Sequence, residues 1–457
     1  MSWLAAATVL CVCVPPGQAH IDSSVQVTAG DIAAAVLVAC AALAALSRGL
    51  RLPPNVLWVF GPMVLALAVS TLCARDVVMS LTGFVRVLEI FLLVPAAVML
   101  TLRRRRDSMI ILGAVALAGL LQAGIGIWQV VTHTGASFAG RNTRAVGTFG
   151  AVDVMAMATV VGYSLIIVLA VILTCSDRRV RLAMVPAAAV LGVALGLALS
   201  RGSWLAVTAG VAVMLALWSR KLALRAAVGA VAVAIVVVGG FGWQSSVLGE
   251  RAQSITASFT QPDQSVGDRF SLWTTAFGIW QDNPVTGVGA KGFPAHRDGY
   301  APMGLSSGSE TEDPQNGYLR QPLLSPHNQY LLILAEQGLA GVIGFVILLG
   351  GLVVGLARRR RADLAWLVAA GFMTTSLTAF AYGDLGGPTC VLTAVMIGMV
   401  AAAALSGPAE RHPLQPSGRR SRGRRSYGRP DGGGSERPLV PGPRRSAVRA
   451  LPPGGPA

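Results

Sequence analysis

The chain has 457 residues, of which 53% are hydrophobic and only 13% are charged, and its mean hydropathy is +0.62. A soluble domain carries roughly 25% charged residues, so the composition argues against a soluble globular protein and indicates a polytopic membrane protein. Part of the net charge of +16 comes from arginines after Ser406, where Tyr427 is the only aromatic residue. Nucleic-acid-binding surfaces interleave basic with aromatic side chains. We therefore predict no nucleic-acid partner and place this tail in the cytoplasm, near anionic lipid.

The apolar residues fall in separate runs, most of them close to the roughly 20 residues that a helix needs to cross a bilayer. The first run resembles the centre of a signal peptide, but it lacks a basic leader and a clear cleavage site, so we interpret it as a short span. We predict an all-α polytopic membrane protein with about twelve transmembrane helices, at residues 3–16, 31–46, 55–73, 84–100, 109–131, 150–174, 182–199, 203–218, 226–243, 329–356, 363–381 and 388–405.

Basic residues alternate between the connections of these runs. Every second connection along the chain is basic, and together these connections hold sixteen Lys and Arg residues. The short connections on the opposite side hold only Arg75, Arg141, Arg144 and Arg201. Basic loops stay in the cytoplasm. We therefore predict that both termini are cytoplasmic and that the long polar segment 244–326 lies on the extracytoplasmic face of the cytoplasmic (inner) membrane.

These features divide the chain into four predicted regions. They are an N-terminal transmembrane bundle of about nine spans at 1–243, a large extracytoplasmic loop at 244–326, C-terminal transmembrane helices at 327–405, and a basic tail at 406–457. The tail is rich in Pro, Gly, Ser and Arg, and it holds too little apolar surface to offset the entropy of ordering, so we predict that it is disordered.

Within the large loop, aromatic residues recur at helical spacing. Phe270, Trp273, Phe277 and Trp280 are three or four residues apart, which predicts an amphipathic helix over 266–281. Its aromatic face is suited to the lipid headgroup region or, equally, to packing on the core of the loop itself.

Three arginines on the predicted outer side are candidates for binding an anion. Arg201 lies in a very tight connection between two apolar runs, where a solvated charge has little room, although it could also extend to lipid headgroups. Arg269 opens the aromatic helix, and Arg144 lies in a short outer loop. A guanidinium places two donors on a phosphate or carboxylate, but surface solvation is an equal alternative for Arg144.

One further charged pair lies inside a predicted span. Arg86 and Glu89 are three residues apart and can pair on one helix face, which lowers the cost of burying them. A structural pair and a substrate contact by Arg86 are both open. The acidic residues Glu310, Glu312 and Asp313 have unspecific spacing, typical of a solvated loop, so no metal site is predicted.

His327 follows Pro326 at the point where the large loop re-enters the membrane. An imidazole exchanges protons near neutral pH, which suits it to general acid–base catalysis. A lone histidine is more often structural, so this residue alone decides little.

Several separated motifs resemble the O-antigen ligase and O-antigen polymerase superfamily. The histidine block runs from Pro326 to Leu331 and continues with Leu334 to Gly338. Upstream lie the Asp282-Asn283-Pro284 and Gly287-Val288-Gly289 elements, the arginine turn Ser200-Arg201-Gly202, and the early element Gly147-Thr148-Phe149-Gly150. The likeness covers about residues 140–345. It departs after the early element, where the family often has a Pro-Asn pair and this chain has Ala151-Val152-Asp153.

The resemblance implies an all-helical membrane glycosyltransferase that uses a polyprenyl-pyrophosphate-linked glycan as donor and a hydroxyl-bearing glycan, lipid or protein as acceptor, with no cofactor. It implies that His327 is the general base and that Arg201 and Arg269 bind the pyrophosphate. The alternative function is a polytopic transporter or flippase of envelope lipids or glycans. Transporters more often place polar residues and broken helices at mid-membrane in both halves of the chain, whereas here the outer polar residues gather around one loop.

Overall fold

The computed structural model describes residues 1–15, 27–138, 140–150, 153–240, 264–313, 317–360 and 363–406. Internal contacts divide the chain into two units, Met1–Ala409 and Glu410–Ala457, and all described residues belong to the first. The predicted disordered tail therefore lies outside the described residues, apart from Ser406.

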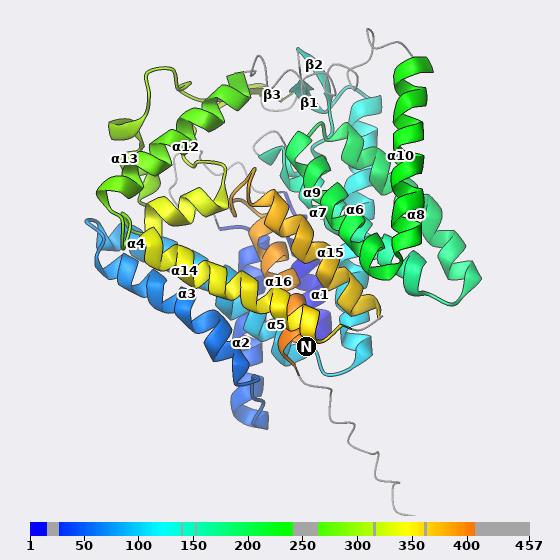
Figure 1. Ribbon diagram of the computed structural model, residues 1–457, viewed down its shortest axis with the longest axis horizontal. Helices are drawn as coiled ribbons and strands as arrows, with labels where there is room; N and C mark the ends of the chain where they lie inside the picture. The colour runs from blue at the N-terminus through cyan, green and yellow to red at the C-terminus, as the bar shows by residue number, and fades with distance from the viewer. Residues whose placement is uncertain are drawn as a thin grey trace, which may run out of the picture. The chain divides into compact units, whose positions relative to one another are not determined.

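The first unit is built almost entirely from helices (Figure 1). The N-terminal elements are α1 (Ser2–Cys11), α2 (Ala29–Arg48), α3 (Asn55–Leu72), α4 (Val77–Leu88), the π-helical η1 (Glu89–Leu93), α5 (Val94–Thr101) and α6 (Arg105–Val131). The middle elements are β1 (Ala136–Phe138), β2 (Arg141–Arg144), the 3-10 turn η2 (Gly147–Phe149), α7 (Ala156–Thr174), α8 (Arg178–Leu197), α9 (Arg201–Trp218) and α10 (Arg220–Gly240). The C-terminal elements are α12 (Gln264–Asp282), α13 (Phe293–Tyr300), β3 (Ser309–Asp313), β4 (Gly317–Gln321), α14 (Gln329–Arg358), α15 (Leu364–Ala379) and α16 (Thr389–Leu405).

Eight helical segments in the described residues are long and apolar enough to cross a membrane, with α4, η1 and α5 joined into one segment. The predicted class, an all-α polytopic membrane protein, is confirmed, and the described residues add two small antiparallel hairpins, β1–β2 and β3–β4. The count of twelve spans and the in–out orientation stay predictions. The first predicted span is α1, which has ten residues and is too short by itself to cross a hydrocarbon core of about 30 Å.

One large apolar core joins the helices. The pairs α9 and α15, α3 and α14, α6 and α7, and α5 and α16 pack closely together. Helix α16 is buried along almost its whole length and lies at the centre of this arrangement (Figure 1). Predicted span 150–174 begins later than expected, at Ala156, because Gly147–Phe149 form a separate turn and the Asp153 side chain caps the helix.

The predicted aromatic helix is present as α12, but its buried face is not the aromatic one. Leu272, Ala276 and Ile279 pack in a second, smaller core, whereas Phe270 and Phe277 are 53% and 45% exposed. The alternative that the aromatic face packs on the core of the loop is therefore wrong for these two residues, and a position in the headgroup region stays a prediction.

Helix α14 is broken by Gly338, which has the backbone angles φ 62° and ψ −161°. The break leaves backbone groups without helical partners, and the connection after α12 supplies replacements. The N–H groups of Leu339 and Ala340 donate to the carbonyls of Pro284 (2.9 Å) and Val285 (3.1 Å).

The carbonyl groups that precede the break also find hydrogen-bond partners outside the helix. The N–H groups of Val288 and Gly289 donate to the carbonyls of Ala335 (3.1 Å) and Glu336 (2.8 Å), and the Ser70 hydroxyl also donates to the Glu336 carbonyl (2.8 Å). Unpaired backbone groups are very costly in an apolar environment, so this connection is what makes a broken α14 tolerable.

We predict that Gly338→Ala lowers the free energy of unfolding by at least about 2 kcal/mol, because a Cβ there would lie 2.4 Å from the Val285 carbonyl carbon and the positive φ disfavours any L side chain. Gly350→Ala is the matched control in the same helix, since a Cβ at Gly350 meets open space. Thermal unfolding in detergent measures both variants. Equal shifts in the two would contradict this account of the break.

Candidate active site

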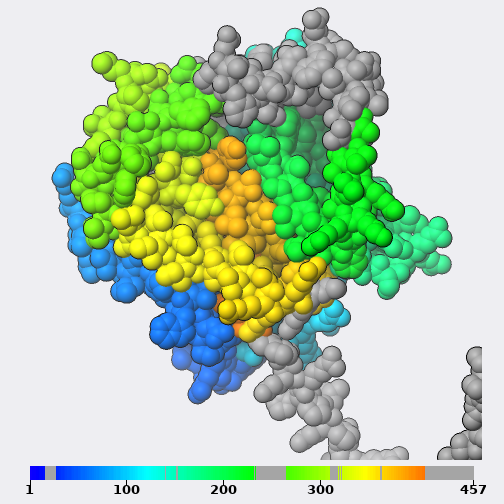
Figure 2. Space-filling model, in the orientation of Figure 1, coloured from blue at the N-terminus to red at the C-terminus, as the bar shows by residue number. Residues whose placement is uncertain are grey.

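The connection between α15 and α16, residues 380–388, is the point to which the candidate residues converge. The start of α14 holds this α15–α16 loop. The Gln329 N–H donates to the carbonyls of Phe380 (2.8 Å) and Gly383 (3.1 Å), and the Gln329 side-chain oxygen accepts the Leu385 N–H at 2.7 Å. In the space-filling view, the orange atoms of the α15–α16 region reach the surface between the yellow-green of α12 and the green of α9 (Figure 2).

Asn328 adds a second attachment. Its side-chain oxygen caps α14 by accepting the N–H groups of Tyr330 (3.0 Å) and Leu331 (3.1 Å), while its side-chain nitrogen donates to the Ala381 carbonyl (3.3 Å). One residue therefore begins the helix and fixes the neighbouring loop.

His327 lies beside Asp384, a loop residue that the sequence analysis did not select. The His327 Nδ1 is 3.7 Å from the Asp384 Oδ1, and the two side chains are 40% and 17% exposed. This distance suits an ion pair once the imidazole is protonated. The imidazole is thus accessible on one side and has a carboxylate on the other.

The backbone of His327 is in the left-handed region, with φ 48°, a conformation that is uncommon for residues other than glycine. Its neighbours fix it there. The His327 N–H donates to the Ser325 hydroxyl (3.3 Å), and the Trp273 indole of α12 donates to the Pro326 carbonyl (3.0 Å). Such conformations persist where the surroundings over-determine them, often at functional sites.

Asp384 is held as a carboxylate. Burial favours its neutral form, but the His327 imidazole and the Ser325 hydroxyl hold the pKa of the Asp384 carboxyl below its ordinary value. A fixed negative charge beside an imidazole orients the ring and stabilises its protonated form.

Two of the three candidate arginines of the outer side, Arg269 and Arg201, belong to segments that contact Tyr382 of this loop. The Arg269 Nη1 donates to the Tyr382 carbonyl at 2.6 Å. Arg201 is the first residue of α9, which is capped by the Ser200 hydroxyl. A Cβ on Gly202 would lie 3.1 Å from the Tyr382 Cβ, so the arginine turn packs directly against the loop. The structure therefore brings Arg201, Arg269 and His327 to one loop.

Arg86 approaches the far end of the loop. Its guanidinium pairs with Glu89 at 2.9 Å, as predicted, and also with Asp31 of α2, and it donates to the Gly387 carbonyl at 3.4 Å. Two carboxylates thus engage one guanidinium, which supports the structural alternative for Arg86. Sequence reasoning missed Asp31 because 55 residues separate it from Arg86.

Arg144 and Asp153 lie near the loop from a third direction. The Asp153 Oδ1 accepts the N–H groups of Met155 (3.3 Å) and Ala156 (3.0 Å), and a Cβ on Gly387 would lie 2.4 Å from its Oδ2. Burial raises the pKa of Asp153 to about 6, and the charge of Asp384 adds to the rise while that of Arg144 opposes it.

The early Gly-Thr-Phe element has a structural explanation. The side chain of Gln122 bonds Thr148 twice, through its backbone N–H (3.0 Å) and its hydroxyl (2.7 Å). Gln129 accepts the Gly147 N–H and donates to the Gly147 carbonyl, both at 2.8 Å. Two glutamines of α6 therefore hold this turn against the helix.

Asp384 carried a signal that could have identified it. It is the only charged residue in the short connection between two apolar runs, which is the argument that singled out Arg201. The roles of Gln329 and Asn328 gave no such signal, because uncharged amides at a helix start are ordinary capping residues.

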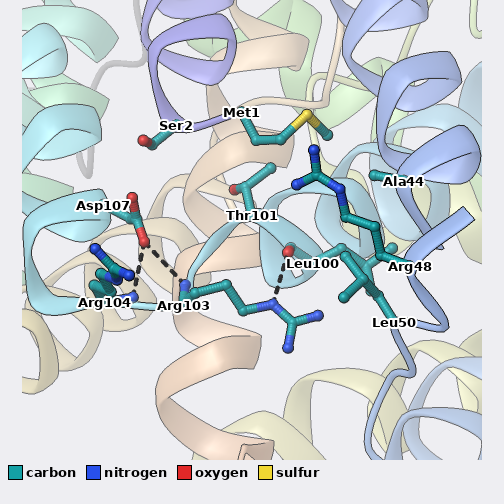
Figure 3. Close-up of a pocket in the computed structure, with 10 residues that line it drawn as sticks. All are labelled: Met1, Ser2, Ala44, Arg48, Leu50, Leu100, Thr101, Arg103, Arg104 and Asp107. Atoms are coloured by element: carbon teal, nitrogen blue, oxygen red, sulfur yellow. Dashed lines mark hydrogen bonds between the residues drawn. The ribbon is translucent and has the colours of Figure 1, made fainter. Parts of the chain in front are cut away.

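A separate cavity of about 300 Å³ is lined by residues outside this loop (Figure 3). It is formed at the starts of α1 and α6 and the ends of α2 and α5, whereas Asp31, which pairs with Arg86, lies in the first turn of α2. Its lining residues are Met1, Ser2, Ala44, Arg48, Leu50, Leu100, Thr101, Arg103, Arg104 and Asp107. In the described ranges, no group of three or more His, Cys, Asp or Glu residues is placed to hold a metal ion.

The fold and site define a multi-pass membrane protein in which a histidine, its aspartate partner and two arginine-bearing segments meet at one loop. Residues 186–346 match the family model for O-antigen ligase, and no curated protein matches the chain. The matched segment runs from α8 into α14 and contains Arg201, Arg269 and His327. The match confirms the resemblance: the chain carries the domain of the O-antigen ligase and polymerase superfamily, which acts in envelope polysaccharide biosynthesis.

We predict that Asp153→Asn stabilises the protein at pH 7.5 by roughly 2 kcal/mol, because ionising a carboxyl whose folded pKa is about 6 costs stability. The contribution of the protonated Asp153 carboxyl to the free energy of unfolding is fully present below the ordinary pKa of 3.8 and is lost as the pH rises through 6. The gain should therefore approach zero near pH 4.

Thermal midpoints in detergent across this pH range test the prediction. Asp177→Asn is the matched control, since Asp177 caps α8 in the same way at an exposed position. A gain for Asp153→Asn that is equal at both ends of the range would contradict the prediction.

Proposed function

We propose that this protein transfers a glycan from a polyprenyl-pyrophosphate carrier to an acceptor hydroxyl on the extracytoplasmic face of the cytoplasmic membrane. The observation that carries the proposal is the convergence on one loop of a histidine–aspartate pair and two arginines from α9 and α12. This set matches the chemistry: one group to remove a proton and two cations to neutralise a diphosphate leaving group.

His327 would act as general base through its Nε2. Its Nδ1 faces the Asp384 carboxylate, so the tautomer with the proton on Nδ1 leaves a lone pair on Nε2 for the acceptor. As the acceptor oxygen forms its bond to the anomeric carbon, its proton passes to Nε2. Asp384 then stabilises the imidazolium that results.

The second half of the displacement breaks the bond between the anomeric carbon and the pyrophosphate oxygen. The bonding pair leaves with the pyrophosphate, so charge develops on that oxygen. A diphosphate leaving group needs neutralisation more than protonation, and Arg201 and Arg269 supply it as fixed donors. A direct displacement of this kind inverts the anomeric centre. Arg144 would add positive potential beside these two.

The break in α14 is the feature that most favours the alternative, a transporter or flippase, because transporters place broken helices at their binding sites. The backbone groups at Gly338 that a transported ion would use are, however, bonded to the 284–289 connection. Glycan transfer gives the His327–Asp384 pair a direct chemical role, the removal of the proton from the acceptor hydroxyl.

We predict that His327→Asn and His327→Ala lower the rate of transfer by at least roughly 100-fold, because the acceptor loses its general base. Asparagine tolerates a positive φ, so His327→Asn separates loss of the base from damage to the backbone. His133→Asn is the matched control, since His133 also has a positive φ, 55°, and is exposed just after the end of α6.

The assay uses the purified protein with a lipid-linked glycan donor and measures the product by mass spectrometry. Transfer by His327→Asn at the wild-type rate would remove the general-base role.

We predict that Arg201→Lys weakens donor use at least about tenfold, since a point charge loses the two-pronged contact of a guanidinium. Arg178→Lys, at the exposed start of α8, is the matched control. Donor titrations give kcat and KM for each variant. Unchanged values for Arg201→Lys would place that residue outside the donor site.

A further inference from the structure

We propose that Gln329 is a positioning residue that holds Asp384 in place beside the His327 imidazole, and this inference rests on the proposed function. Gln329 begins α14 two residues after His327 and is 5% exposed. Besides the Phe380 carbonyl, its contacts fall on the two residues that flank Asp384 in the chain, which is what distinguishes it from a residue that only fills the core.

The contacts form a clamp on both sides of the carboxylate. On one side, the Gln329 N–H donates to the Gly383 carbonyl at 3.1 Å. On the other, the Gln329 side-chain oxygen accepts the Leu385 N–H at 2.7 Å. The peptide groups before and after Asp384 are therefore fixed to a residue that is itself two positions from the base.

Because of this clamp, the residues at the start of α14 fix the position of Asp384 relative to His327. Asn328 between them caps α14 and holds Ala381, so three consecutive residues all contribute. Without the side-chain bond, the Leu385 N–H loses its partner and residues 384–385 can rotate away from the imidazole. His327 and Asp384 are 3.7 Å apart, so a rotation of residues 384–385 away from the imidazole lengthens this distance and weakens the electrostatic interaction of the two side chains.

A side-chain substitution can test this without removing the whole clamp. Gln329→Met keeps a similar volume and both backbone bonds of residue 329, and it removes only the acceptor for Leu385. Gln337→Met is a matched control: Gln337 lies two turns later in the same helix and is 1% exposed, and the side-chain oxygen that it loses accepts no hydrogen bond in the described structure.

We expect Gln329→Met to lower kcat roughly tenfold with KM for the donor unchanged, because Gln329 acts on the base and not on the pyrophosphate. Gln337→Met should keep the wild-type kcat. In an Asp384→Ala background, Gln329→Met should cause no further loss, since the group that it positions is already gone. Equal fractional losses in the wild-type and Asp384→Ala backgrounds would overturn the proposal, as would an effect on donor KM alone.

Hydrogen–deuterium exchange tests the clamp independently of activity. A peptide that covers 380–388 should exchange faster in Gln329→Met than in wild type or Gln337→Met, and an unchanged exchange rate would overturn the proposal. If wild-type protein shows no transfer at all, the proposed function fails, while the exchange result still decides whether Gln329 holds the loop.

Discussion

The site depends on the hydrogen bonds between the first residues of α14 and the α15–α16 loop. An unpaired buried amide costs roughly 1–3 kcal/mol in a protein and more where water cannot reach it, so the contacts of Asn328 and Gln329 at once begin a helix and fix a loop. Everything else approaches that loop from outside: Arg269 from α12, the arginine turn from α9, and Arg86 from α4. The proposed catalytic geometry therefore requires that several helices first pack correctly.

The motifs of the superfamily fall into two physical classes in this structure. The Asp-Asn-Pro and Gly-Val-Gly elements pair with the backbone of α14 around Gly338, and the Gly-Thr-Phe element is bound by two glutamines of α6. The role of these segments is to form hydrogen bonds that hold the backbone in place. His327, Arg201 and Arg269 instead present ionisable side chains at the loop. A specific sequence pattern is thus no guide to chemistry until its hydrogen bonds are known.

Much of the helical architecture follows from the sequence, because apolar runs have the right length and their ends carry basic residues. Predicted 55–73 appears as Asn55–Leu72, and predicted 203–218 as Arg201–Trp218. The break at Gly338 was not predicted, since a glycine in an apolar run fits a packed helix equally well, as Gly344 does. The pairing of His327 with Asp384 and that of Arg86 with Asp31 were missed for another reason: the partners are distant in sequence, and single-sequence patterns report only local spacing.

The site also extends beyond the segment that identifies the family. The matched residues end at 346, inside α14, whereas the carboxylate beside the histidine comes from residue 384 and depends on α15 and α16 for its position. A homologue truncated after residue 346 would keep every recognisable motif and both arginines, yet it would lack the α15–α16 loop, and its histidine would have no counter-ion. Whether such a chain could carry out the proposed glycan transfer is decided by the two C-terminal helices, which carry no diagnostic sequence pattern of their own.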